Sequence, residues 1–273
     1  MELDEALRAL IPAADAGFRA WEAAIPRVAA LVLQGATLRV GDARLRVLEV
    51  EAYVRARWHP DPFTHADPAQ SALGRWYFHR TGGTYRAGTF KGVDLTFGAE
   101  GVHAGLLIRA VRSGEGARVE GPSCVVDHAL QATRHATVAS LARACEAGDH
   151  DALALTLDDT PRRDAVYAGP RVGLSLRPGA TPERVFFLPR PYRFVVDPRG
   201  AKKGRAAIAL GMHMQGASPP AIAGITGSAL AQVRRWIDAF DAGRAMAPES
   251  LRGAEDGEAL CALLGACTAH GHG

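Results

Sequence analysis

A β-strand is predicted by the stretch Arg44-Leu45-Arg46-Val47-Leu48-Glu49-Val50-Glu51-Ala52-Tyr53-Val54, in which apolar and polar residues alternate. Successive side chains of a strand point to opposite faces of a sheet, so Glu49, Glu51 and Tyr53 share one face. The apolar side chains between them face the other way. The strand therefore places carboxylates beside an aromatic ring.

The N-terminal segments predict helices followed by a hairpin. Residues 1–35 are alanine-rich and predict helices that are broken near Pro12 and Pro26. Alternation then runs from Ala36 to Val54, and Gly41-Asp42 is a turn dipeptide within it. The predicted strand is thus the second arm of a hairpin.

The segments that follow complete an α+β prediction for residues 1–197. Residues 55–100 are irregular but rich in aromatic residues, which indicates long ordered loops. A strand is predicted at 104–112, a helix at 124–148 and further strands at 170–196. We expect a mixed, mainly antiparallel sheet with surrounding helices and a protruding hairpin.

The composition indicates a globular protein. The chain has 273 residues, of which 48% are hydrophobic, and this is enough for a sizeable core. A net charge of +3 permits a polyanionic partner without requiring one. The cysteines form no CxxC pair, the N-terminus is acidic, and no apolar run approaches the ~20 residues that span a bilayer. We expect a cytoplasmic monomer with no membrane partner and no cofactor.

Two later residues extend the polar face into a candidate site. His65 follows Phe63-Thr64, and Arg109 lies in the apolar run from Gly105 to Ala110. The set suits water-activated hydrolysis of a flat substrate, in which a carboxylate deprotonates the attacking water. Glu51 is the candidate for this role, and Arg109 is its candidate neighbour. A structural ion pair between the two is the alternative.

No metal site is expected. His59 and His65 have no third ligand at a suitable spacing. The C-terminal set Cys261, Cys267, His270 and His272 is more simply the end of an alanine-rich helix and its tail than a zinc cluster.

Five short motifs follow one another along the chain. They are Glu51-Ala52-Tyr53, Thr64-His65-Ala66, Leu107-Ile108-Arg109-Ala110, Gly169-Pro170-Arg171-Val172-Gly173 and Pro191-Tyr192-Arg193-Phe194. In this order, over roughly 150 residues, the series resembles the alkyladenine (3-methyladenine) DNA glycosylase family. Each motif alone is too short to be persuasive, so the resemblance rests on the series.

The resemblance implies a role for each matched residue. Glu51 would activate a water molecule that is also held by Arg109 and by a backbone carbonyl near Val172. Tyr53 and His65 would sandwich a base that has been rotated out of the DNA duplex. The reaction would need no metal and no cofactor, and its substrate would be duplex DNA that carries a damaged or modified base.

The hairpin departs from the family pattern. The family typically has Tyr-Val-Tyr-x-x-Tyr-Gly, which supplies a pocket tyrosine and a ring wedged into the duplex. Tyr85 matches the first tyrosine, but Ala87 stands where a stacking ring is expected, and Phe90 is bulky enough to replace the wedge. The family's base-selecting Leu-Asn reads Leu95-Thr96. A small residue at 87 predicts weak action on 3-methyladenine and better action on a larger base.

Residues 198–273 predict a small all-α extension outside the glycosylase-like domain. After a basic linker, the segment from Ala206 to Trp236 resembles a helix-turn-helix, whose second helix would enter a DNA groove. A helical hairpin that only packs is the alternative. The residues expected to contact DNA are Lys91, Lys202, Lys203, Arg234 and Arg235, and for Lys91 a Schiff base with the sugar is a second possibility.

The sequence predicts a monofunctional DNA glycosylase of base excision repair. Its catalytic residues would be Glu51 and Arg109, and its substrate-binding residues would be Tyr53, His65, Tyr85, Phe90, Thr96 and Val172. A non-catalytic module that binds modified or bent DNA is the alternative function. Hydrolysis of free nucleosides is disfavoured by the wedge residue and the basic linker.

Overall fold

Two compact units make up the chain. The structure, a computed structural model, describes residues 2–149 and 151–271. The first unit contains the residues up to Pro60 together with Thr64–Val166, and the second contains Asp61–Phe63 together with the chain from Tyr167 onward. The boundary predicted after residue 197 concerns where the glycosylase-like sequence ends, and it stays a prediction.

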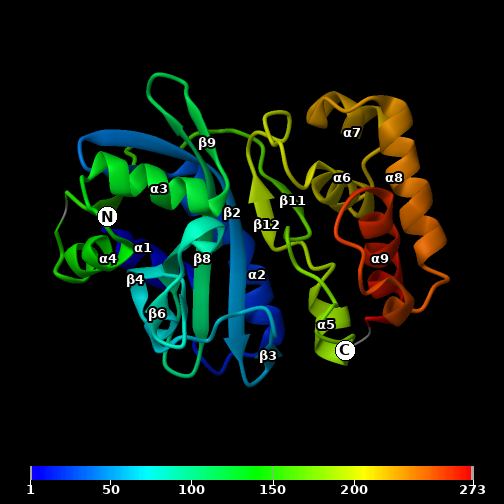
Figure 1. Cartoon of the computed structure of the whole chain (residues 1–273), viewed down its shortest axis with the longest axis horizontal. Helices are drawn as coiled ribbons and strands as arrows, with labels where there is room; N and C mark the ends of the chain where they lie inside the picture. The colour runs from blue at the N-terminus through cyan, green and yellow to red at the C-terminus, as the bar shows by residue number, and fades with distance from the viewer. Residues whose placement is uncertain (1, 150, 272–273) are drawn as a thin grey trace. The chain divides into compact units, whose positions relative to one another are not determined.

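An antiparallel sheet forms the centre of the first unit (Figure 1). Its strands lie in the order β10 (Leu153–Leu157), β1 (Ala36–Val40), β2 (Ala43–Ala56), β8 (His103–Ser113), β7 (Val93–Phe97) and β4 (Leu73–Phe78). The short strands β3 (His59–Pro60) and β9 (Arg118–Glu120) pair with β2 and β8. The predicted hairpin is confirmed, because Val40 pairs with Ala43 on either side of Gly41-Asp42.

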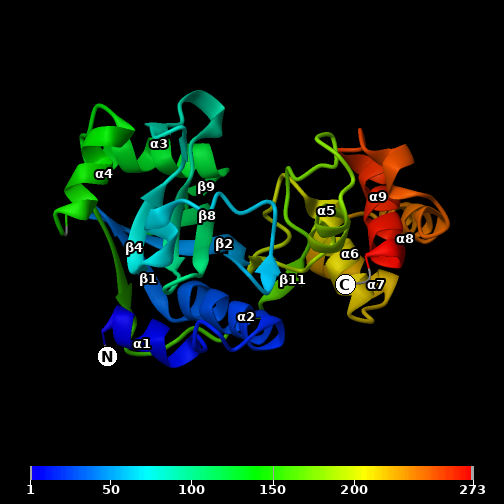
Figure 2. The same cartoon turned by 90° about the horizontal axis from the view of Figure 1, so that it is seen from below.

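Helices cover both faces of this sheet (Figure 2). One face packs against α1 (Leu3–Leu10) and α2 (Phe18–Gln34), and the other packs against α3 (Pro122–Ala132) and α4 (Val138–Glu146). The apolar sides of the helices are buried against the inner faces of the strands. The buried residues include Trp21, Ile25 and Val28 of α2, Val47 and Val50 of β2, and Leu106 and Ile108 of β8. The mixed α+β class and the mainly antiparallel sheet are confirmed.

Two helix predictions need correction. Pro26 lies inside α2 instead of ending a helix. Pro26 cannot donate one of the backbone hydrogen bonds of the helix. The burial of Trp21, Ile25 and Val28 against the core stabilises α2 despite this missing bond. The single helix predicted at 124–148 is two helices, and Thr137 caps the second of them through its side chain.

The segment from 55 to 100 is more regular than predicted. It contributes β4 and β7 to the sheet, a separate hairpin of β5 (Arg80–Thr81) and β6 (Thr84–Tyr85), and the 3₁₀ turns η1 (Pro68–Ser71) and η2 (Gly88–Phe90). All of β7 is buried, as are the neighbouring residues Tyr77 and Phe78 at the end of β4. β4 shows no polar and apolar alternation. β7 does alternate, but it is only five residues long and lies in a segment rich in Gly, Pro and aromatic residues, so it was predicted as part of a loop.

The second unit is mainly helical. β11 (Tyr167–Gly169) pairs with β12 (Arg193–Val195), and α5 (Pro182–Phe187) lies where the sequence predicted only strands. Thr181 caps α5, and Pro182 occupies its first turn, where a missing N–H is tolerated. The helical extension consists of α6 (Arg205–Met214), α7 (Pro219–Thr226), α8 (Leu230–Gly243), the 3₁₀ turn η3 (Pro248–Leu251) and α9 (Gly257–His270).

A buried ion pair ties the segment Asp61–Phe63 into the second unit. Arg171 donates two hydrogen bonds to Asp61, with Nη1 2.6 Å from Oδ2 and Nη2 3.2 Å from Oδ1. Both side chains are 0% exposed. The guanidinium also lies 5.4 Å from the ring centroids of Phe63 and Tyr192. Arg171, in the Gly-Pro-Arg-Val-Gly motif, therefore has a structural role within this unit.

Candidate active site

The pairing of β2 with β8 is irregular at the candidate site. Val47 pairs with Val111, Glu49 with Ala110, and Val50 with Ile108. The β2–β8 pairing therefore skips Leu48 of β2 and Arg109 of β8, which have no partner in the register. Such bulges re-aim a side chain, and they are common beside active sites. Here the irregularity brings Arg109 against the carboxylates of β2.

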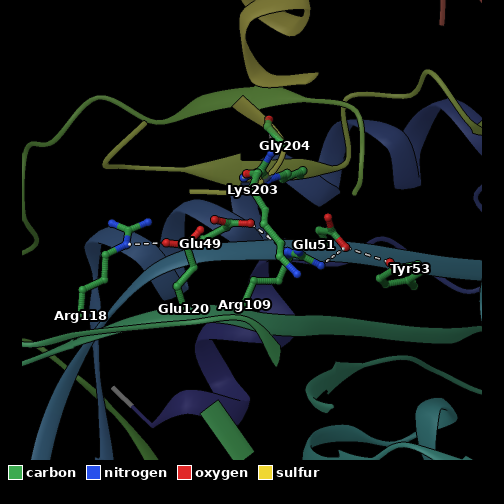
Figure 3. Close-up of polar contacts among 9 residues, drawn as sticks. Glu49, Glu51, Tyr53, Arg109, Arg118, Glu120, Lys203 and Gly204 are labelled. Carbon is green, nitrogen blue, oxygen red and sulfur yellow. Dashed lines mark hydrogen bonds and ion pairs between the residues drawn. The ribbon is translucent and has the colours of Figure 1, made fainter. Parts of the chain in front are cut away.

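Arg109 bridges two glutamates of the neighbouring strand (Figure 3). Its Nε lies 2.8 Å from Oε1 of Glu49, and its Nη1 lies 3.2 Å from Oε2 of Glu51. Tyr53 donates its hydroxyl to the same Glu51 oxygen at 2.9 Å. The structure thus brings Glu51, Tyr53 and Arg109 together, with Glu49 in the same group, and their catalytic and base-binding roles stay predictions.

The charges of this group are buried. Glu49 is 2% exposed, Glu51 is 0% exposed and Arg109 is 8% exposed. Burial alone lowers the pKa of Arg109, but the negative charges of Glu51 and Glu49 outweigh it and hold that pKa above its usual value. Arg109 therefore stays charged and contacts both carboxylates.

His65 lies in a second cluster of the first unit. Its Nδ1 is 3.2 Å from the hydroxyl of Tyr77, and its ring packs edge-on against His79 with centroids 4.5 Å apart. His79 in turn bonds to Asp94, with Nε2 2.8 Å from Oδ1, and Gln70 donates to the other oxygen of Asp94 at 3.1 Å. This cluster fixes the orientation of the His65 ring.

Burial sets the protonation of this cluster. Burial, followed by the nearby His79, lowers the pKa of His65 from 6.5 to about 4. Burial, followed by the charge of Asp67, raises the pKa of Tyr77 to about 12. At neutral pH the His65 ring is therefore uncharged, and Tyr77 keeps the proton that it can donate to Nδ1.

The lowered pKa of His65 predicts an acid sensitivity of the fold. Between pH 6.5 and about 4 the unfolded chain binds a proton at this histidine that the folded chain does not, so stability is lost as the pH falls through this window. We expect His65→Gln to flatten the fall of Tm over the same window, whereas His135→Gln, outside the cluster, leaves it steep. Parallel Tm curves for His65→Gln and the unaltered protein would exclude this role.

Tyr85 and Phe90 lie farther along the hairpin region. Arg80 lies 5.7 Å from the ring centroids of both Tyr77 and Tyr85, so Tyr85 adjoins the His65 cluster through this arginine. Phe90 is 73% exposed, which leaves its ring available as a wedge. It lines an open pocket of about 350 Å³ together with Ala87.

Three other predicted residues have defined surroundings. The Thr96 hydroxyl is fully buried and bonds to the backbone N–H and carbonyl of Arg75, so it completes the pairing of β4 with β7. Lys91 forms an ion pair with Asp127 at 2.8 Å. Val172 lies in the second unit, where its side chain packs close to Gly204, and its role in holding water stays a prediction.

The predicted DNA contacts of the extension are exposed. Lys202, Lys203 and Arg234 lie at the surface, and Arg235 is exposed while paired with Glu258 at 3.1 Å. Within residues 2–149 and 151–271, no three His, Cys, Asp or Glu side chains are grouped so as to hold a metal ion. His272, one member of the C-terminal set, lies outside the described residues. No described helix is both long and apolar enough to cross a bilayer.

Sequence reasoning missed Tyr77, His79 and Asp94. Tyr77 lies in β4, which shows no alternation, His79 follows that strand directly, and Asp94 lies in the five-residue strand β7. Tyr77 rather than Tyr85 contacts His65 directly. The run of aromatic residues Trp76-Tyr77-Phe78 was the available signal, since rings gather in base-binding sites. An open pocket of about 600 Å³, lined by Arg55, Arg57 and His103 among others, was also missed.

Comparison with known proteins places the chain in a family. No protein-family model matches the sequence. "Uncharacterized protein L759" of Acanthamoeba polyphaga mimivirus is 29% identical over 184 residues, which cover 61% of this chain and 82% of the viral protein. "Putative 3-methyladenine DNA glycosylase" of Rhodococcus jostii (strain RHA1) is 32% identical over 168 residues, which cover 55% of this chain and 72% of that protein. The chain belongs to the 3-methyladenine DNA glycosylase family.

Proposed function

We propose that this protein is a monofunctional DNA glycosylase. It would hydrolyse the N-glycosidic bond of an alkylated or otherwise modified base in DNA, as a step of base excision repair. The observation that carries the proposal is the buried group of Glu51, Arg109 and Tyr53 in a chain of this family. Membership of the family supports DNA as the substrate.

The geometry around Glu51 suits the activation of water. Arg109 and Tyr53 both donate to Oε2 of Glu51, which fixes the plane of the carboxylate. A carboxylate held in this way deprotonates a water molecule as it attacks the sugar carbon, and its negative charge stabilises the oxocarbenium-like transition state. Low-dielectric surroundings strengthen this second effect.

Recognition of the base rests on rings and on uncharged donors. Tyr53, on the Glu51 strand, and His65, held by Tyr77, are the proposed faces of the base sandwich. The small Ala87 beside Phe90 supports the expectation of a bulkier base, whereas the ring of Tyr77 beside His65 supports an ordinary alkylated purine. Which of the two dominates decides the substrate preference.

Phosphate contacts have a candidate place in the first unit. Arg55 and Arg57 are exposed and line the 600 Å³ pocket with His103. Arg55 follows Tyr53 on the same strand by two residues, so both side chains lie on the same face. We propose that the strand containing the damaged base is held here, since guanidinium groups suit phosphate oxygens.

The proposal predicts base release from damaged duplex DNA. Duplexes that carry 3-methyladenine, other alkylated bases, deaminated bases or bulky adducts are incubated with the full chain, and abasic sites are counted after alkali cleavage. We expect release from at least one alkylated duplex and none from undamaged DNA.

The alternative function has its own support. Glu51 is completely buried and ion-paired with Arg109, which is also expected of a purely structural ion pair. A protein that binds modified DNA without releasing a base would retain such a pair. Tight binding without release from any duplex of the panel would favour that binding module and contradict the glycosylase.

A further inference from the structure

Three helices of the second unit pack on one another, and α9 packs along α8 beside them. Each of α6, α7 and α8 contacts the other two. Their shared core includes Ala209, Leu210, Ile222, Val233 and Ile237, all of them buried. The core of this bundle contains none of the residues of the candidate active site.

The connection between α7 and α8 is a tight turn. Gly227 has a φ of +68°, in the left-handed region that favours glycine, and only Ser228 and Ala229 separate it from α8. Arg199 closes the turn from outside by donating to the carbonyl of Gly224 at 2.7 Å. A short glycine-containing turn between two helices is typical of helix-turn-helix DNA-binding motifs.

The charged residues from 198 to 235 are all basic. From residue 198 to residue 235 the sequence contains no Asp or Glu, and its basic residues are Arg199, Lys202, Lys203, Arg205, Arg234 and Arg235. The side chains of Arg199 and Arg205 donate to main-chain carbonyls, so these contacts do not neutralise their charge. The acidic residues of α8, Asp238 and Asp241, lie in its second half.

The first half of α8 presents this charge on an exposed face. Ala231, Arg234 and Arg235 are all exposed and lie within about one helical turn of each other. Arg235 is paired with Glu258, whereas Arg234 makes no ion pair within the described part of the chain. Ala231, a small residue one turn before the two arginines on the same face, leaves room for a close partner surface.

We propose that α7, its turn and the first half of α8 form a second DNA-binding surface, which binds undamaged duplex DNA. The N-terminal half of α8 would lie in the major groove, as the second helix of such motifs does, and Arg234 would contact a phosphate or a base edge. This surface would hold the enzyme on DNA between lesions. It shares no residue with the site that contains Glu51, and it does not require base release.

The test compares two exposed alanines of α8. Ala231→Glu places a carboxylate one turn before Arg234 and Arg235, next to both, and Ala242→Glu places the same group on the same side of the helix three turns away. Binding of the full chain to a short undamaged duplex is measured by fluorescence anisotropy over a range of salt concentrations. We expect Ala231→Glu to weaken binding at least tenfold, and Ala242→Glu to bind like the unaltered chain.

A milder substitution checks the number of phosphate contacts. Arg234→Gln should make the slope of log K against log salt shallower by about 0.9 if the residue contacts one phosphate. The control Arg252→Gln removes an exposed arginine outside the bundle and should leave the slope unchanged. Equal affinities for Ala231→Glu, Ala242→Glu and the unaltered chain would overturn the proposal, even if the protein releases bases. Loss of binding in Ala231→Glu would support it even if no base is released.

Discussion

Base release should vanish when Glu51 is replaced by glutamine. Glutamine keeps the size of the side chain and can still contact Tyr53 and Arg109, but it neither takes a proton from water nor stabilises a positive sugar. We expect the single-turnover rate of release to fall by about 10²–10⁴-fold, the usual contribution of a general base. Affinity for the damaged duplex, measured with the same DNA, should stay close to that of the unaltered protein.

Glu49 provides the matched control for this experiment. It lies on the same strand, is almost equally buried, and bonds to the same arginine through Nε. Glu49→Gln removes the same charge from the same group, so a purely structural effect would appear in both variants. We expect release by Glu49→Gln to remain well above that of Glu51→Gln. Equal losses, or a greater loss in Glu49→Gln, would remove Glu51 from the catalytic role.

The largest effect on stability is expected at Asp61. Asp61→Ala leaves the Arg171 guanidinium buried without its carboxylate, and breaking a buried pair in this way costs about 3–5 kcal/mol. Hydrogen exchange of the α5 to α9 amides should detect the loss, since it reports the second unit separately when two units unfold independently. Those amides should exchange faster in the variant by a factor that corresponds to this free energy.

Two further variants separate charge from packing. The pair Asp61→Leu with Arg171→Met replaces the ions by apolar groups, and we expect it to restore much of the protection. Asp238→Ala removes an exposed aspartate of α8 and should change little. Asp61→Ala with exchange rates like those of Asp238→Ala would show that the buried pair adds nothing to the stability of this unit.

The sequence predicted those parts of the fold in which local pattern and burial agree. The hairpin of β1 and β2 alternates because one of its faces carries polar groups, β8 contains a short apolar run, and the alanine-rich C-terminal segment forms helices. β4 escaped prediction because its sequence shows no alternation. β7 escaped because its five alternating residues lie in a segment otherwise rich in Gly, Pro and aromatic residues. Pro26 misled the prediction because tertiary packing outweighs the propensity of one residue.

The candidate site was predictable in its residues but not in its register. Glu51 and Tyr53 follow from strand periodicity, and the family resemblance pointed to Arg109. The bulges at Leu48 and Arg109 depend on how two strands pair, and one strand's sequence does not contain that information. The partners of His65 are fixed by tertiary contacts, so periodicity alone could not find Tyr77 or His79.

Asp61–Phe63 belong to the second unit although they lie within the sequence of the first, and this limits how the gene can recombine. Because one side of the Arg171 ion pair is encoded far upstream of the rest of that unit, no single contiguous stretch of the gene carries the unit whole. A recombination event within the intervening region would separate Asp61 from Arg171. Recombination between relatives therefore keeps Asp61 and Arg171 from the same parent only when the breakpoint lies before Asp61 or after Arg171. Exchange of the C-terminal helices alone, with a breakpoint after Arg171, meets this condition.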